Sequence, residues 1–379
     1  MKRKLFFLTV TLLAFLCLKV FSQPIIINHD CAKLEPIPAS AIEKAKQTLH
    51  IAYAHTSHGS QITKGMRDLE GQKNLKGYKG DIYGWSEGGI GDKLDIDDRF
   101  IGGDLGHNGN VSWAEPTRNY LKKNTDVNVV IYSWCGGCSD NTPEGIQAYL
   151  DKMNELEQEF TNVKFVYMTG HRDIWADATL KANNQQIRDY CIANDKILYD
   201  FADIESYDPD GKYYEFANDN CDYYSGAGTG LLGNWATEWQ DSHTEGVDWY
   251  DCSAAHSKPL NGNLKAYAAW WLWARLAGWQ GTTDVEKPDN IITVFRLNQN
   301  YPNPFNPNTI INYELPENGE VLLEVYNSLG EKITTLVNRK ENKGVHKVNF
   351  SAYNLPSGLY FYRISYNNKI ITKKMVLLK

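Results

Sequence analysis

The sequence has no long apolar segment beyond its first 21 residues, which excludes an integral membrane bundle. It lacks the glycine periodicity of collagen and the apolar-poor composition of a disordered chain, since its 379 residues are 42% hydrophobic and 22% charged. Basic residues are in the minority, with a net charge of −7, and this argues against nucleic acid as a partner. No internal repeat of solenoid period is present.

The single apolar run spans residues 5–21. Basic residues occupy positions 2–4 before it, and Val20-Phe21-Ser22 precedes Gln23. This pattern predicts a secretory signal peptide over residues 1–22, whose removal leaves no transmembrane anchor. The remaining chain has 35 basic and 46 acidic residues, a net charge of −11.

Tryptophan and cysteine are missing from the C-terminal part. All 11 Trp lie between Trp85 and Trp279, and no Cys follows Cys252. From Asn298 onward the chain has ten basic and six acidic residues, whereas residues 23–297 carry a net charge of −15. These shifts predict a first domain over 23–280, a linker over 281–297 and a second domain over 298–379.

Six cysteines follow the predicted signal peptide: Cys31, Cys135, Cys138, Cys191, Cys221 and Cys252. An exported chain meets an oxidising environment, so up to three disulfides are expected, with pairings that stay open. Cys135-Gly-Gly-Cys138 has the spacing of a redox motif, but in this setting it predicts a structural disulfide.

Strand and helix patterns alternate through the first domain. Ser40 and Glu43 form a capping box that opens a helix over 40–49, and a strand over 50–54 follows it. Apolar runs at 127–134, 163–169 and 196–201 predict further strands, separated by helices over 142–160 and 180–193; a last helix spans 263–277. Residues 65–115 and 204–260 are expected to be mainly loops. The pattern predicts a three-layer α/β fold of flavodoxin-like type, a parallel sheet flanked by helices.

The C-terminal part shows six short alternating runs between turn signals, which predict a small β-sandwich. The segments YPNPFNPNTIINYELPENGEVLLEVYNSLGEKI and SGLYFYRI and the ending KKMVLLK resemble the C-terminal sorting domain of type IX secretion, an immunoglobulin-like fold. The resemblance implies the type IX machinery as a partner and export through the periplasm of a Gram-negative bacterium, to a secreted or cell-surface location. The alternative is a plain accessory sandwich.

Reactive side chains follow each predicted strand of the first domain. Because the carboxyl ends of parallel strands share one edge of a sheet, these residues are expected to line one cleft. They are His55 to Ser60, Cys135 to Asn141, Gly170 to Asp173, Asp200 and Asp203, with Asp251 and His256 before the last helix.

This layout resembles the SGNH (GDSL-like) hydrolases, in which a Ser follows the first strand and an acid and a His precede the last helix. The resemblance implies Ser57 as nucleophile, His256 as its general base and Asp251 as the acid. Gly88 or Gly89 and Asn141 are the oxyanion candidates. The cleft would be lined by His55, His58, His171 and Asp173. The chain departs from the family pattern: His55-Thr56 replaces Gly-Asp, Ser253 stands where Asp precedes His256, and no Gly-x-Asn-Asp follows the second strand.

These residues predict a secreted serine esterase that needs no cofactor. An acidic domain rich in Trp and Tyr suits an acylated carbohydrate or polysaccharide, with rings in loop-like stretches available for stacking on sugars. The loop tryptophans are Trp85, Trp113, Trp175, Trp235, Trp239 and Trp249.

The sequence leaves several alternatives open. Ser57 could be only a helix N-cap, and Ser60 competes with it as nucleophile. A metal-dependent hydrolase would use the histidine cluster, and a carboxylate pair could act in acid hydrolysis. The absent family motifs also allow a glycan-binding or adhesion module without catalysis. The metal candidates are His55, His58, His171, Asp173, His243 and His256, and the carboxylates are Glu205, Asp208 and Asp210.

Overall fold

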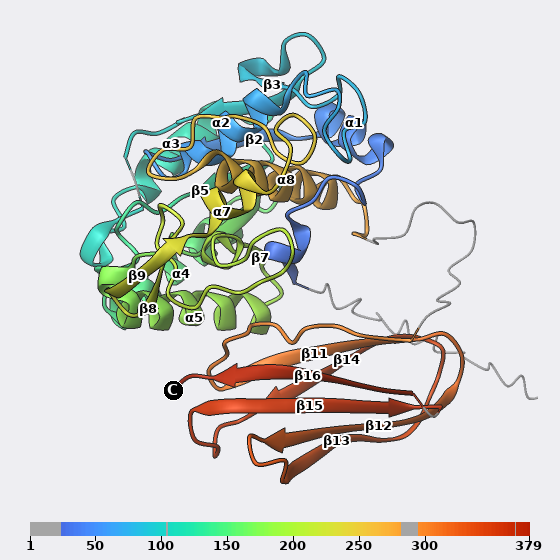
Figure 1. The fold of residues 1–379 in the computed structure, drawn as a ribbon. Helices are drawn as coiled ribbons and strands as arrows, with labels where there is room; N and C mark the ends of the chain where they lie inside the picture. Colours follow the sequence, from blue (N-terminus) through green and yellow to red (C-terminus); the bar gives the residue numbers. More distant parts are fainter. Residues whose placement is uncertain (1–23, 104, 282–294, 368) are drawn as a thin grey trace, which may run out of the picture.

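The computed structural model describes residues 24–103, 105–281, 295–367 and 369–379. Its hydrophobic side chains form two separate clusters, one from Ile27 to Ala277 and one from Phe295 to Leu377. Figure 1 shows the corresponding α/β part and the all-β C-terminal part. The predicted signal peptide and most of the predicted linker lie outside the described residues. Among the described helices, none is both long and apolar enough to cross a membrane.

The α/β part is built on a seven-stranded parallel sheet with strand order β1-β7-β6-β5-β2-β4-β3. This confirms the predicted α/β class with a parallel sheet. The central strands β5, β2 and β6 are almost wholly buried, which explains their continuous apolar runs. The strands are β1 Ile25–Ile27, β2 His50–Ala54, β3 Trp85–Ser86, β4 Leu94–Asp98, β5 Val129–Tyr132, β6 Lys164–Met168 and β7 Ile197–Tyr199.

Helices flank the sheet in two groups: α1, α2 and α8 pack together, and α3, α4 and α5 pack together (Figure 1). The helices α2 and α8 approach closely, because a Cβ on Gly65 would lie 2.4 Å from the carbonyl oxygen of Gly262. A side chain at position 65 would therefore push the two helices apart. The helices are α1 Ala39–Thr48, α2 Ser60–Leu69, α3 Ala114–Lys123, α4 Pro143–Glu159, α5 Asp177–Ala193, α6 Phe201–Ile204, α7 Trp235–Asp241 and α8 Pro259–Leu276.

Most of the predicted helices and strands begin and end within a few residues of the observed ones, because their signals are local. Thr142 caps α4 as expected, its hydroxyl accepting a hydrogen bond from the Gly145 amide at 3.2 Å, with Pro143 in the first turn. The capping box at Ser40 is wrong, because α1 begins at Ala39 with Pro38 at its N-cap and no side chain caps it. The edge strands β1 and β3 and the inner strand β4 were not predicted. The two edge strands have only three and two residues, and β3 and β4 lie in the segment 65–115, which was expected to be mainly loops.

The C-terminal part contains two antiparallel sheets, with strand orders β10-β11-β14 and β13-β12-β15-β16. The six strands expected from alternation are all present, and β10 adds a short edge strand. Their buried faces form the second hydrophobic cluster. The strands are β10 Arg296–Leu297, β11 Asn308–Leu315, β12 Gly319–Asn327, β13 Lys332–Glu341, β14 Gly344–Ser351, β15 Gly358–Tyr366 and β16 Lys369–Leu377. A separate hairpin, β8 Asp222–Gly226 with β9 Thr229–Asn234, belongs to the α/β part.

Candidate active site

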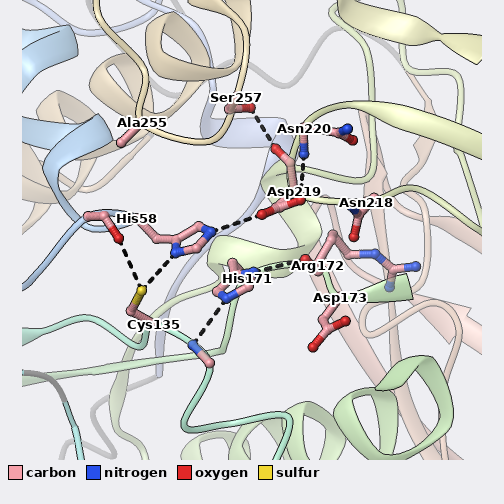
Figure 2. A network of polar contacts seen from close by, with 12 residues as sticks. His58, Cys135, His171, Arg172, Asp173, Asn218, Asp219, Asn220, Ala255 and Ser257 are labelled. Carbon is pink, nitrogen blue, oxygen red and sulfur yellow. Dashed lines mark hydrogen bonds and ion pairs between the residues drawn. The ribbon is translucent and has the colours of Figure 1, made fainter. Parts of the chain in front are cut away.

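Three neighbouring strands carry the candidate site at their carboxyl ends. The strands β2, β5 and β6 are adjacent in the sheet, and they are followed by His58, Cys135 and His171 respectively. Figure 2 shows these side chains converging with Asp219, which lies on the loop before β8. The expectation that reactive residues at the strand ends lie together thus holds for these three segments.

The turn after β2 lies tightly against the end of β5. A Cβ on Gly59 would lie 2.1 Å from the Ser133 hydroxyl oxygen and 2.4 Å from the His55 Cβ. Only glycine fits this position without displacing its neighbours. The close approach brings His58, the preceding residue, next to the segment that begins at Cys135.

His58 links a thiol to a carboxylate. Its Nδ1 lies 3.0 Å from the Cys135 Sγ, and its Nε2 lies 3.0 Å from the Asp219 Oδ2 (Figure 2). The Ser57 hydroxyl lies 3.2 Å from the same sulfur. A nucleophile, an imidazole and a carboxylate in this sequence of contacts form the arrangement of a catalytic triad. The ring nitrogens have the opposite assignment from the usual serine triad, in which Nε2 faces the nucleophile.

The electrostatics of the trio favour a charged pair at neutral pH. The hydrogen bond from His58 outweighs the effect of burial and lowers the pKa of the Cys135 thiol to about 6. Burial disfavours the imidazolium, but hydrogen bonds to Asp219 and Cys135 outweigh it and raise the pKa of His58 to about 9. Burial acts against the Asp219 carboxylate, yet the bond from His58 holds its pKa below the usual value. Both pKa shifts favour a thiolate beside an imidazolium, and the thiolate is the reactive form of cysteine.

His171 lies flat against His58, with ring centroids 3.6 Å apart and planes 2° from parallel. Its Nδ1 donates to the Arg172 carbonyl at 2.8 Å, so Nε2 is the unprotonated nitrogen, and it accepts from the Gly136 amide at 3.2 Å. Burial and the nearby positive charge of His58 lower the pKa of His171. These shifts favour a neutral His171 ring stacked on a protonated His58 ring.

The loop that carries Asp219 is tied to the segment after β6. The Arg172 guanidinium donates to the carbonyls of Glu215 at 2.7 Å and Ala217 at 3.2 Å. The Asn218 side chain accepts from the Ile174 amide at 3.0 Å. These bonds explain how a carboxylate in an irregular loop stays at a fixed distance from His58.

Ser57 and His256, the expected nucleophile and base, are not paired with each other in the structure. Ser57 bonds to Cys135, and within the described chain no hydrogen bond joins Ser57 to His256. The exposed His256 instead stacks on the other side of the site, with its ring centroid 4.5 Å from that of His58. Asp251 is exposed on the segment before α8. Ser60 is the first residue of α2, and its hydroxyl donates to the Ser57 carbonyl at 2.7 Å.

Other expected residues have structural partners. His55 bonds through Nε2 to Asp98 at 2.7 Å, and Asp173 caps the short helix Ile174–Ala176. The Asn141 side chain donates to the carbonyls of Gly106 and Gly137 and accepts from the Gly109 amide, so its polar atoms hold a loop. Gly88 lies beside the edge strand β3, in the turn Glu87–Gly89. Through these contacts Asn141 and His55 stabilise the loops around the site.

The predicted disulfide between Cys135 and Cys138 is not formed, because all six described cysteines are free. The Cys135 sulfur faces His58 and Ser57, whereas the buried Cys138 donates to the Asn184 side chain at 3.3 Å. Burial raises the pKa of Cys138 to about 12. The pKa values of the two thiols are therefore shifted in opposite directions, which favours the thiolate at Cys135 and the neutral thiol at Cys138.

A metal ion also has candidate ligands here. One nitrogen each of His58 and His171 and one oxygen of Asp219 lie within 4.8 Å of one another. Two imidazoles and a carboxylate are a donor set typical of zinc. Of the metal candidates from the sequence, His58 and His171 belong to this cluster in the described chain. His243 lies elsewhere, stacked on Trp239 at 3.6 Å.

Sequence reasoning missed Asp219 and the contact between Cys135 and His58. Cys135 follows its strand directly, so the rule for strand ends could have found it, but its spacing to Cys138 favoured a disulfide. Asp219 lies in an Asp-rich loop where no periodicity separates one carboxylate from another. Of the carboxylates proposed for acid hydrolysis, Glu205 is buried in an ion pair with Lys265, and Asp208 accepts hydrogen bonds from its own turn.

The fold and site together define a two-part protein: an α/β body with a polar site at its strand ends, and an all-β module behind it. Residues 299–378 match the family model of the secretion system C-terminal sorting domain. The chain therefore carries such a sorting domain, which indicates export to a secreted or cell-surface location and interaction with the type IX machinery.

Other comparisons are weak. No curated protein matches the chain. PorZ, a surface component of the type IX secretion system of Porphyromonas gingivalis, is 15% identical over 22% of this chain and 11% of its own, with a TM-score of 0.16. The endo-β-1,4-mannanase of Thermotoga petrophila is 10% identical over 75% of this chain and 57% of its own, with a TM-score of 0.20. Similarity at this level assigns no activity to the α/β part.

Proposed function

We propose that this protein is an exported thiol hydrolase that cleaves acyl esters, with Cys135 as nucleophile, His58 as acid and base, and Asp219 as the residue that orients His58. One observation carries the proposal: the His58 ring bridges the Cys135 sulfur and the Asp219 carboxylate at 3.0 Å on each side. The hydrolase class agrees with the expectation from sequence, but the proposed nucleophile changes from Ser57 to its neighbour in space.

The reaction follows from the charges. The Cys135 thiolate attacks the carbonyl carbon, and as the tetrahedral intermediate collapses, the His58 imidazolium protonates the leaving alkoxide. Water then attacks the thioester, giving a proton to the now neutral His58, and the thiolate is released with the carboxylic acid. The Ser57 hydroxyl donates to the sulfur and stabilises the thiolate before attack.

An acylated carbohydrate is the substrate class we favour. Trp175 is 74% exposed and follows the His171 segment by a few residues, so a ring is available for stacking on a sugar face beside the site. The β8–β9 hairpin lies close to this ring, since a Cβ on Gly228 would be 3.1 Å from it. The indole thus contacts the hairpin while most of its surface stays exposed.

Selective alkylation tests the nucleophile. Iodoacetamide at pH 7 should label Cys135 much faster than the other five described thiols, because Cys135 is ionised and partly exposed while they are buried. Peptide mass mapping after short exposure measures the site. Preferential labelling of any other cysteine would contradict the proposal, and the His58→Gln variant is the matched control, expected to label at least about tenfold more slowly.

The metal cluster is the second candidate, favoured by the mutual distances of His58, His171 and Asp219. If the thiol acts without metal, dialysis against EDTA should leave ester hydrolysis unchanged within about twofold, because no step above needs a Lewis acid. Loss of activity with EDTA and its return with Zn²⁺ would instead support a metal-dependent hydrolase. Metal content of the purified protein, measured by mass spectrometry, is the accompanying control.

A further inference from the structure

The segment before α8 touches the site at two points. The His256 ring stacks on His58 at 4.5 Å, and the Ser257 hydroxyl donates to the Asp219 carbonyl at 2.7 Å (Figure 2 shows Ser257 and Asp219). His256 has a φ of +63°, a left-handed conformation that costs free energy for any residue with a side chain. Such backbone persists only where surrounding contacts fix it.

Two buried amides fix this segment. The Gln61 side chain donates to the Ala255 carbonyl at 2.5 Å, and the Asn261 side chain donates to the Ser257 hydroxyl at 2.7 Å. Gln61 and Asn261 come from α2 and α8, and both side chains are fully buried. The segment is therefore held from both helices at once.

A buried ion pair joins these amides to the other side of the site. The Lys265 ammonium contacts Gln61 and bonds to the Glu205 carboxylate at 2.5 Å. Glu205 also accepts from Asn261 at 3.4 Å and, through its second oxygen, from the Arg172 amide at 2.7 Å. One network thus connects Arg172, which follows His171, with Ala255 and Ser257, which flank His256.

Stability alone does not account for this pair. Both ions are fully buried, and replacing a buried ion pair by apolar residues of similar volume is often neutral or stabilising. Glu205 accepts directly from the Arg172 amide, and through Gln61 and Asn261 the pair is connected to the Ala255 carbonyl and to the Ser257 hydroxyl, which donates to Asp219. The network therefore has a geometric role that an apolar core would not fill.

We propose that Glu205 and Lys265 are positioning residues, which hold the segments 171–172 and 255–257 on either side of His58, and that Ser257 is the member that fixes Asp219. The proposal rests on the proposed function for the role of the trio. It adds residues that touch no substrate but set the distances on which His58 and Cys135 depend.

The experiment compares Ser257→Ala with Ser257→Thr. Ser257 is half-buried, so both variants should fold with melting temperatures near that of the parent. We expect Ser257→Ala to lower kcat and the iodoacetamide rate at Cys135 by roughly ten- to hundredfold with little change in KM, since misplacement affects reactivity more than binding. The Thr variant should restore both rates because it keeps the hydroxyl. Unchanged rates in Ser257→Ala would overturn the proposal.

A double variant, Glu205→Gln with Lys265→Met, tests the ion pair without leaving a lone buried charge. We expect it to melt near the parent temperature and to lose alkylation rate as Ser257→Ala does. A folded double variant with the parent alkylation rate would overturn the role of the pair. Alkylation does not require turnover, so a parent protein that hydrolyses no ester would refute the proposed function while the alkylation comparison still decides the positioning role.

Discussion

Replacing Cys135 with alanine should lower ester hydrolysis by at least about a thousandfold, because the acyl-thioester route loses its nucleophile. The measurement is kcat/KM on a p-nitrophenyl ester with the purified full chain. Folding should be unaffected, since Cys135 is only partly buried and lies after β5, outside the hydrophobic cluster.

Two matched variants distinguish the contribution of Cys135 from those of its neighbours Cys138 and Ser57. Cys138→Ala removes a buried, un-ionised thiol three residues away and should leave turnover within a fewfold of the parent. Ser57→Ala removes one hydrogen bond to the sulfur and should cost about tenfold, in line with one charge-assisted bond. If Ser57→Ala abolished turnover and Cys135→Ala did not, the serine esterase expected from the family resemblance would replace the thiol hydrolase.

Ester hydrolysis should show a bell-shaped dependence on pH, rising through about 6 and falling through about 9. The rise reflects ionisation of the Cys135 thiol, whose pKa is lowered to about 6 by His58. The fall reflects loss of the imidazolium proton, because the pKa of His58 is raised to about 9 by its bonds to Asp219 and Cys135 against the effect of burial. Thiolate and imidazolium coexist only between these limits, and the two values belong to the interacting pair.

Alkylation gives the control for this profile. It needs the thiolate but no proton from His58, so its rate should rise through about pH 6 and then stay high where hydrolysis falls. In Asp219→Asn the imidazolium loses its carboxylate partner, and the midpoint of the alkylation profile should move up toward the ordinary thiol value of 9.0. A midpoint near 9.0 in the parent protein would contradict the charged pair.

Much of the fold was predictable because its signals are local. The helix α4 was predicted from Thr142 and Pro143 at its start and from an apolar stripe along its length, which are features of neighbouring residues. The strands β2, β5 and β6 were predicted from short apolar runs that a buried parallel sheet requires. The edge strands β1 and β3 were missed because they have only three and two residues, too few to show a strand pattern without the neighbours with which they pair.

The site was predictable only in part. The rule that strand ends share an edge brought His58, Cys135 and His171 together, but it could not say which groups would touch. Spacing along the chain suggested Cys135 with Cys138, whereas the fold turns one sulfur toward His58 and the other into the core. Asp219 gave no signal, because its position depends on bonds from Arg172 to a loop without regular structure.

The sequence by itself determined the parallel α/β body, the separate C-terminal sorting module and the set of reactive side chains that gather at one edge of the sheet. Only the tertiary structure decided which groups contact His58. Those partners lie 77 and 161 positions away along the chain. Contacts over such separations depend on strand order and loop packing, which no local pattern of residues encodes.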